Sequence, residues 1–198
     1  MLLSVMLTIL LALTPAPPLP CTPPPILHKG IAPQTMLTYQ FYGAWTPTEE
    51  ACVEQGLSIW SHATADTVRL QFHPVASVQD HPTVSLTKTR LPFPIGGAVV
   101  GVRRDANGYV IGGGVVYSDD PSRLSSCDGL RKTTLHEIGH LMGLGHVEDT
   151  PVGVWSSIMQ PSMRGANDRE AQLPSTVTGC DIEQARRAMD GEVSGHRE

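Results

Sequence analysis

Positive charge is scarce in this sequence: 14 lysines and arginines stand against 19 aspartates and glutamates among 198 residues, a formal charge of −5. This balance argues against a nucleic-acid partner, which would need a basic surface. Charged residues of both signs make up only 17% and hydrophobic residues 40%, so the composition supports a folded core and not a disordered chain. The length fits one domain with a short appendage.

Aromatic residues are also few, at 5%, so the core has to be built from aliphatic side chains. The apolar run at residues 1–13 is too short to cross a bilayer, which takes about 20 residues, and it is typical of a secretory signal peptide. We therefore expect no stable membrane span. The sequence predicts a signal peptide at 1–20, a proline-rich linker at 21–35, one folded domain at 36–190 and a frayed tail at 191–198.

Cysteines number only four, and no two of them form a Cys-x-x-Cys pair, which argues against a cysteine zinc knuckle. Because export is expected, the even number suggests up to two disulfides, with three possible connectivities. Cys21 follows the expected signal peptide, so a lipid anchor at this residue is an alternative to a disulfide. The four positions are Cys21, Cys52, Cys127 and Cys180.

Short runs of β-branched, aromatic and alternating apolar residues predict strands, and an Asn-Gly pair at 107–108 predicts a hairpin turn. The predicted strands cover 36–42, 68–72, 83–87, 98–102 and 109–117. Capping residues and apolar spacings of three and four predict helices that begin at Thr46-Pro47, at Asp128 and at Thr178 or Gly179. These helices are expected to end near residues 62, 143 and 189.

The second predicted helix carries a metal-binding pattern. His136 and His140 stand four residues apart, so both imidazoles lie on one helix face and can reach one ion. A straight helix could not direct His146 to the same ion, so Gly143 must turn the chain, which glycine can do with a positive φ. Three imidazoles with one open position describe a catalytic zinc site, in which Glu137 would act as general base toward the metal-activated water.

With Gly143 included, these residues resemble the HExxHxxGxxH motif of the metzincin metallopeptidases. The segment Ser157–Gln160 resembles the Met-turn of that group, with Met159 beneath the zinc. Within the group the chain looks most like a matrixin catalytic domain, and this resemblance spans roughly residues 36–190. It implies an α+β fold: a twisted, mixed five-stranded sheet with an N-terminal helix and an active-site helix, then a small C-terminal subdomain with the Met-turn and a final helix.

The resemblance also implies a substrate cleft. An extended peptide would pair with the edge strand at Gly97, Ala98, Val99 and Val100, in the manner of an added strand. The primed-side wall would come from Pro161, Ser162 and Met163.

The chain also departs from the matrixin pattern. Val147 stands where matrixins usually have serine, and we find no match to the matrixin second-zinc histidines among the scattered His62, His73 and His81. Calcium is a second candidate ion, at Asp105, Asp119 and Asp120, although turn chemistry explains Asp105 equally well.

Two further expectations about the cysteines depend on the same resemblance. A bridge between Cys52 and Cys180 would resemble a link of the astacins, and it would leave Cys21 to pair with Cys127. Alternatively, Cys21 would be a thiolate that blocks the zinc, as the matrixin prosegment cysteine does.

The leading hypothesis for the function is a secreted, monomeric zinc endopeptidase that cleaves protein or peptide substrates. The alternative is a catalytically inactive, zinc-stabilised peptide-binding module.

Overall fold

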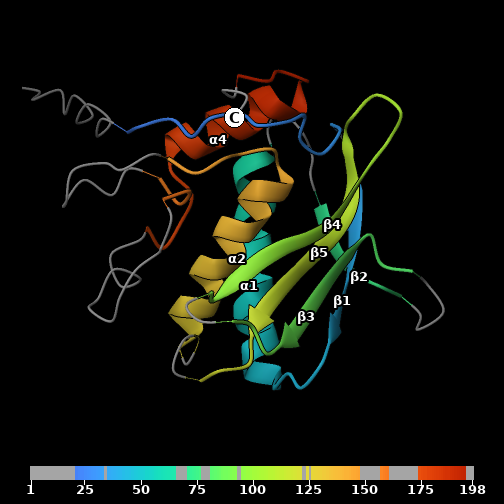
Figure 1. The fold of residues 1–198 in the computed structure, drawn as a ribbon, viewed down its shortest axis with the longest axis vertical. Coiled ribbons are helices and arrows are strands. Elements are labelled where there is room, and N and C mark those ends of the chain that lie inside the picture. The colour runs from blue at the N-terminus through green and yellow to red at the C-terminus, as the bar shows by residue number, and fades with distance from the viewer. Residues whose placement is uncertain are drawn as a thin grey trace, which may run out of the picture.

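The computed structural model describes residues 21–33, 35–65, 71–76, 81–92, 95–121, 124, 126–147, 157–160 and 174–194. This part of the chain forms an α+β fold with five strands and three helices (Figure 1). The strands are β1 (Met36–Tyr42), β2 (Gln71–Pro74), β3 (Val84–Thr89), β4 (Gly97–Arg104) and β5 (Val110–Ser118), and the helices are α1 (Pro47–Thr64), α2 (Cys127–Leu141) and α4 (Gly179–Met189).

The five strands form one mixed sheet, as predicted, and their order is β2-β1-β3-β5-β4. Neighbours from β2 to β5 pair in parallel, and β4 pairs antiparallel with β5 through the predicted hairpin, which leaves β4 at the edge. Figure 1 shows α1 and α2 side by side along the sheet, with α4 across their ends. The second strand differs from its prediction: it covers residues 71–74, whereas residues 68–70 lie outside the described residues.

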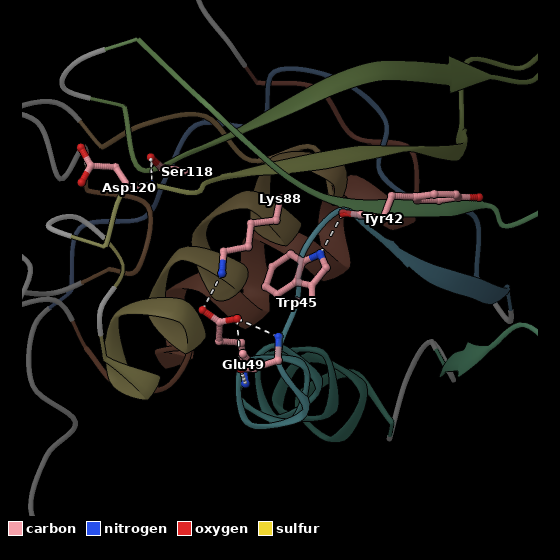
Figure 2. Close-up of polar contacts among 7 residues, drawn as sticks. Tyr42, Trp45, Glu49, Lys88, Ser118 and Asp120 are labelled. Atoms are coloured by element: carbon pink, nitrogen blue, oxygen red, sulfur yellow. Dashed lines mark hydrogen bonds and ion pairs between the residues drawn. The ribbon is translucent and has the colours of Figure 1, made fainter.

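Helix α1 begins where the sequence predicts it, with a complete capping box. The Thr46 side chain accepts the Glu49 backbone N–H, and the Glu49 carboxylate accepts the Thr46 backbone N–H at 2.9 Å. The same carboxylate pairs with Lys88 of β3 at 2.6 Å, and the Lys88 ammonium lies 5.6 Å from the ring centroid of Trp45 (Figure 2). These contacts fix the first turn of α1 to the carboxyl end of β3.

Helix α2 packs closely against α1, because Gly56 lies opposite Thr134. A Cβ on Gly56 would lie 2.8 Å from the Thr134 Cβ, so the two helices could not approach as they do with a larger residue there. Trp60, fully buried, donates its indole N–H to the Leu135 carbonyl at 2.9 Å. The helix begins differently from the prediction: Ser126 is the N-cap, whereas Asp128 lies in the first turn and pairs with Lys132 at 2.7 Å.

The described part of the proline-rich stretch at 21–35 packs against the rest of the fold. Ile26 and Ile31 are fully buried, because they form bridges with Leu144 and Val110. The same segment also contacts residue 194, since the Ser194 backbone N–H donates to the Ile26 carbonyl at 2.9 Å. Proline content suggested an extended segment, but it gave no sign that the two isoleucines would enter the core.

The disulfides join Cys21 to Cys180 and Cys52 to Cys127. The expected pairing of Cys52 with Cys180 is therefore wrong, and so are the blocking thiolate and the lipid anchor at Cys21. The physical reason lies in the packing: Cys52 in α1 faces the start of α2, whereas the N-terminal segment passes along α4. Among the described helices, none is long and apolar enough to cross a membrane.

Candidate metal centre

Three histidine side chains converge at the end of α2. The Nε2 atom of His136 lies 3.1 Å from that of His146 and 3.2 Å from that of His140, and the Nε2 atoms of His140 and His146 are 3.2 Å apart. Among the described residues, this is the one group of His, Cys, Asp or Glu side chains able to hold a metal ion. The structure therefore brings together the three residues that the spacing singled out.

The turn that returns His146 to the helix depends on Gly143, whose φ is +95°. Side chains rarely adopt this conformation, and a Cβ here would also collide with the His28 carbonyl oxygen. After the turn, the chain pairs with the N-terminal segment: the Leu27 N–H donates to the Gly143 carbonyl at 2.8 Å, and the Gly145 N–H donates to the Pro25 carbonyl at 2.7 Å. The loop that carries the third histidine is thus held from both sides.

The hydrogen bonds of the imidazoles leave their Nε2 atoms available as ligands. The Nδ1 atoms of His136 and His140 each lie 2.8 Å from a backbone carbonyl, that of Ile158 and that of Leu144. A carbonyl can only accept, so each Nδ1 carries the proton and each Nε2 carries a lone pair. Lone pairs directed at one another across 3.1–3.2 Å repel unless a cation lies between them.

The spacing fits a metal ion of the expected size. Ligand nitrogens about 2.05 Å from a tetrahedral ion are roughly 3.3 Å apart, close to the separations observed. His136, His140 and His146 would supply three of the four ligands of such an ion. The group therefore suits an open three-nitrogen site.

Burial keeps the histidines neutral. Burial first, and then the neighbouring His140, lowers the pKa of His136 to about 3, and burial lowers the pKa of His140 to about 4. The pKa of His146 is also lowered, by burial. Neutral imidazoles are the form that binds metal, so these nitrogens need not lose protons before coordination at neutral pH.

Glu137 lies beside the histidines, on the helix face toward β4. It is 6% exposed, and burial raises the pKa of its carboxyl group to about 7, while a hydrogen bond from the Val99 backbone N–H acts in the opposite direction. A carboxylate with this pKa can take up and release a proton near neutral pH.

Met159 packs against α2 at Gly139. A side chain at Gly139 would collide with the Met159 sulfur, so the glycine between the two helical histidines allows this contact. The turn itself is fixed by Asp181 of α4, which accepts the Ser157 hydroxyl at 2.5 Å and the Ile158 backbone N–H at 3.1 Å. The turn at residues 157–160 thereby connects His136 to the last helix.

The remaining predicted site residues lie in different places. Gly97, Ala98, Val99 and Val100 form the first half of the edge strand β4. Pro161, Ser162 and Met163 lie outside the described residues. The Asp105 carboxylate accepts the backbone N–H groups of Asn107 and Tyr109, both at 2.9 Å, so hairpin-turn chemistry accounts for it. Asp119 and Asp120 join no metal group within the described part of the chain.

Several residues that shape the site were not singled out from the sequence for this role. Asp181 is fully buried and Trp60 bonds to the backbone of α2, but an acid in a first turn and a tryptophan in an amphipathic helix have ordinary explanations. Gly139 could have been noticed, because a glycine inside a helix weakens it and needs a packing reason.

The fold can be compared with solved structures. It is similar to archaemetzincin from Methanopyrus kandleri, with a TM-score of 0.52 and 14% sequence identity, over 79% of this chain and 96% of that chain. The GM1-bound form of the ECX AB5 holotoxin matches with a TM-score of 0.48 and 17% identity, over 80% of this chain and 81% of that chain. Myroilysin matches with a TM-score of 0.41 and 21% identity, over 60% of this chain.

The chain spans about half the length of the myroilysin chain it matches, 52%. No family model matches the sequence, and no curated protein sequence matches it. At these identities the likeness is one of fold. The chain therefore has a metzincin-like fold, and at the end of its second helix it carries a group of three histidines able to hold a metal ion.

Proposed function

We propose that this chain is an extracytoplasmic, zinc-dependent endopeptidase of the metzincin type. The observation that carries the proposal is the group of three Nε2 atoms, 3.1–3.2 Å apart, next to the buried Glu137 carboxylate. Within the metzincins we propose a matrixin-type domain, because the segment Ser157–Gln160 resembles the matrixin Met-turn.

Zinc is the proposed ion because of the donor set. Three neutral imidazoles with an open fourth position are typical of catalytic zinc, whereas calcium and magnesium prefer oxygen ligands. When bound, zinc supplies Lewis-acid activation of a water molecule and of a peptide carbonyl. His136 and His140 are kept in the ligating tautomer by their Nδ1–H bonds to backbone carbonyls, as described above.

Glu137 is the proposed general base. Its carboxylate takes a proton from the attacking water and passes it to the nitrogen that leaves when the peptide bond breaks. The raised pKa of about 7, caused by burial, suits this exchange near neutral pH.

The edge strand β4 supports a peptide substrate. Its outer side has no strand partner within the described residues, so an extended peptide can add to the sheet there. Gly97 through Val100 would pair with the substrate backbone, and Pro161, Ser162 and Met163 are proposed for the primed-side wall. The two disulfides support an oxidising, extracytoplasmic compartment.

The proposal is tested with fluorogenic peptides and the zinc-loaded protein. We expect hydrolysis that a chelator or a hydroxamate blocks, and a loss of about 10²–10⁴-fold in kcat for Glu137→Ala with zinc retained. Glu183→Ala, which removes an exposed acid from α4, is the matched control and should retain activity. Zinc retention without turnover across a peptide library would favour the non-catalytic binding module instead.

A further inference from the structure

Gly97 is the first residue of β4, the strand whose ribbon crosses in front of α2 in Figure 1. A Cβ on Gly97 would lie 2.5 Å from Thr133 Cγ2 and 3.3 Å from Glu137 Cγ. Non-bonded carbon atoms pack at about 3.5–4.0 Å, so a larger residue at this position requires β4 or α2 to move.

Helix α2 has little room to move away from β4. On its other side, Thr134 packs against α1 at Gly56, where an added Cβ would also lie only 2.8 Å from the threonine. The adjacent residues Thr133 and Thr134 thus face two glycines, one on the edge strand and one on α1. A methyl group at Gly97 would therefore displace the start of β4 and not the helix.

The start of β4 supplies a hydrogen bond to the proposed base. The Ser118 N–H donates to the Gly96 carbonyl at 2.8 Å, so residue 96 faces β5 in the antiparallel ladder. Because such pairing alternates along a strand, Gly97 and Val99 direct their backbone N–H and C=O groups to the free edge. The Val99 N–H does not stay free there, because it lies within reach of the Glu137 carboxylate and favours its charged form.

We infer that Gly97 is a positioning residue: its missing side chain lets β4 close on α2, so that the Val99 N–H holds the Glu137 carboxylate in one orientation toward the histidine group. This inference rests on the proposed function, in which Glu137 is the general base. The missing Cβ of Gly97 faces α2 and not the free edge, so the absence of a side chain acts on the base, whereas the backbone groups of Gly97 stay available to the bound peptide. It also follows that the substrate can use the Val99 carbonyl but not its N–H.

The kinetic test compares Gly97→Ala with the double variant Gly97→Ala/Thr133→Ala, in which the methyl group 2.5 Å away is removed. We expect kcat of Gly97→Ala to fall about 100-fold, because a misplacement of a catalytic group by about 1 Å has an effect of this size. Its KM should stay within about threefold of the wild-type value, and zinc should be retained. The double variant should recover at least about tenfold of that loss. Thr133→Ala and Gly179→Ala are the controls, since a Cβ at Gly179 would meet no atom within 4 Å.

Amide hydrogen exchange of Val99 in the zinc-loaded protein tests the same inference without activity. We expect slow exchange in the wild type, fast exchange in Gly97→Ala and in Glu137→Ala, and slow exchange again in the double variant. Unchanged protection in Gly97→Ala, or a kinetic loss confined to KM, would overturn the inference. If the wild type cleaves no peptide, the proposed function fails, while the exchange pattern still decides the role of Gly97.

Discussion

The Nδ1 atom of His136 lies 2.8 Å from the carbonyl oxygen of Ile158, the residue directly before Met159. The His136 imidazole is therefore oriented by the turn at residues 157–160 and not by α2 alone. The Ile158 N–H in turn donates to Asp181, so one continuous set of hydrogen bonds connects α4 to the metal centre.

We predict that Asp181→Ala loosens the metal centre from a distance. The variant leaves the buried Ser157 hydroxyl and Ile158 N–H without their acceptor, and each such group costs about 1–3 kcal/mol. The free energy of unfolding should fall by at least about 2 kcal/mol, and zinc affinity about tenfold or more, as for other residues that orient a ligand. Chemical denaturation and competition with a chelator measure the two effects. Glu183→Ala, exposed on the same helix, should leave both unchanged.

We predict that Gly143→Ala weakens zinc binding. The loss in the free energy of zinc binding should be larger than the loss in the stability of helix α2. Its φ of +95° and the nearby His28 carbonyl oppose any side chain, and the strain costs about 1–3 kcal/mol. The chain can relieve this strain by moving His146 away from the two helical histidines. Gly179→Ala is the control, because that glycine has no positive φ and open space around it. Equal zinc affinity in the two variants would contradict this prediction.

The sequence was most informative where one local pattern determines the structure. The four-residue spacing of His136 and His140, the capping residues Thr46 and Thr178 and the Asn107-Gly108 turn each act over a few residues, and the corresponding elements formed as predicted. The third histidine was also predictable, because a glycine three residues after His140 can end the helix and return the chain.

Contacts between distant segments were not predictable in this way. The pairing of Cys21 with Cys180 spans 159 residues, and only the path of the N-terminal segment along α4 decides it. The burial of Ile26 was not predictable either. Its neighbours Pro24 and Pro25 favour an extended chain, and the chain would be extended both in an exposed linker and in a segment packed against the fold. Glu137 was identified from its place in the motif, but its hydrogen bond with Val99 depends on the register of β4.

We predict that the two disulfides affect the metal centre differently. Cys21–Cys180 fixes the segment that pairs with Gly143 and Gly145, whereas Cys52–Cys127 joins α1 to the start of α2. Replacing either pair by alanine should lower the free energy of unfolding by about 2–4 kcal/mol. Only Cys21→Ala/Cys180→Ala should also weaken zinc binding, measured by chelator competition at a temperature where both variants are folded. A larger loss of affinity in the Cys52/Cys127 variant would show that this assignment is wrong.

The last prediction concerns the pH dependence of stability in the metal-free protein. Burial lowers the pKa values of His28, His136, His140 and His146 from 6.5, so below pH 6.5 the unfolded chain binds protons that the folded protein does not. This stabilising contribution is complete above pH 6.5 and is lost as the pH falls. Glu137 acts in the opposite direction between pH 4.5 and about 7, because the folded protein holds its proton longer than the unfolded chain.

Several histidines outweigh one glutamate, so the free energy of unfolding should rise between pH 5 and 6.5. Each uncompensated proton contributes up to about 1.4 kcal/mol per pH unit. Urea denaturation in the presence of a chelator measures the slope. His136→Gln should flatten it, Glu137→Gln should steepen it, and His73→Gln controls for the loss of an imidazole exposed on β2. If the free energy of unfolding is constant or falls from pH 5 to 6.5, the histidines are not buried in the neutral form. A steeper pH dependence in His136→Gln than in the wild type would have the same meaning.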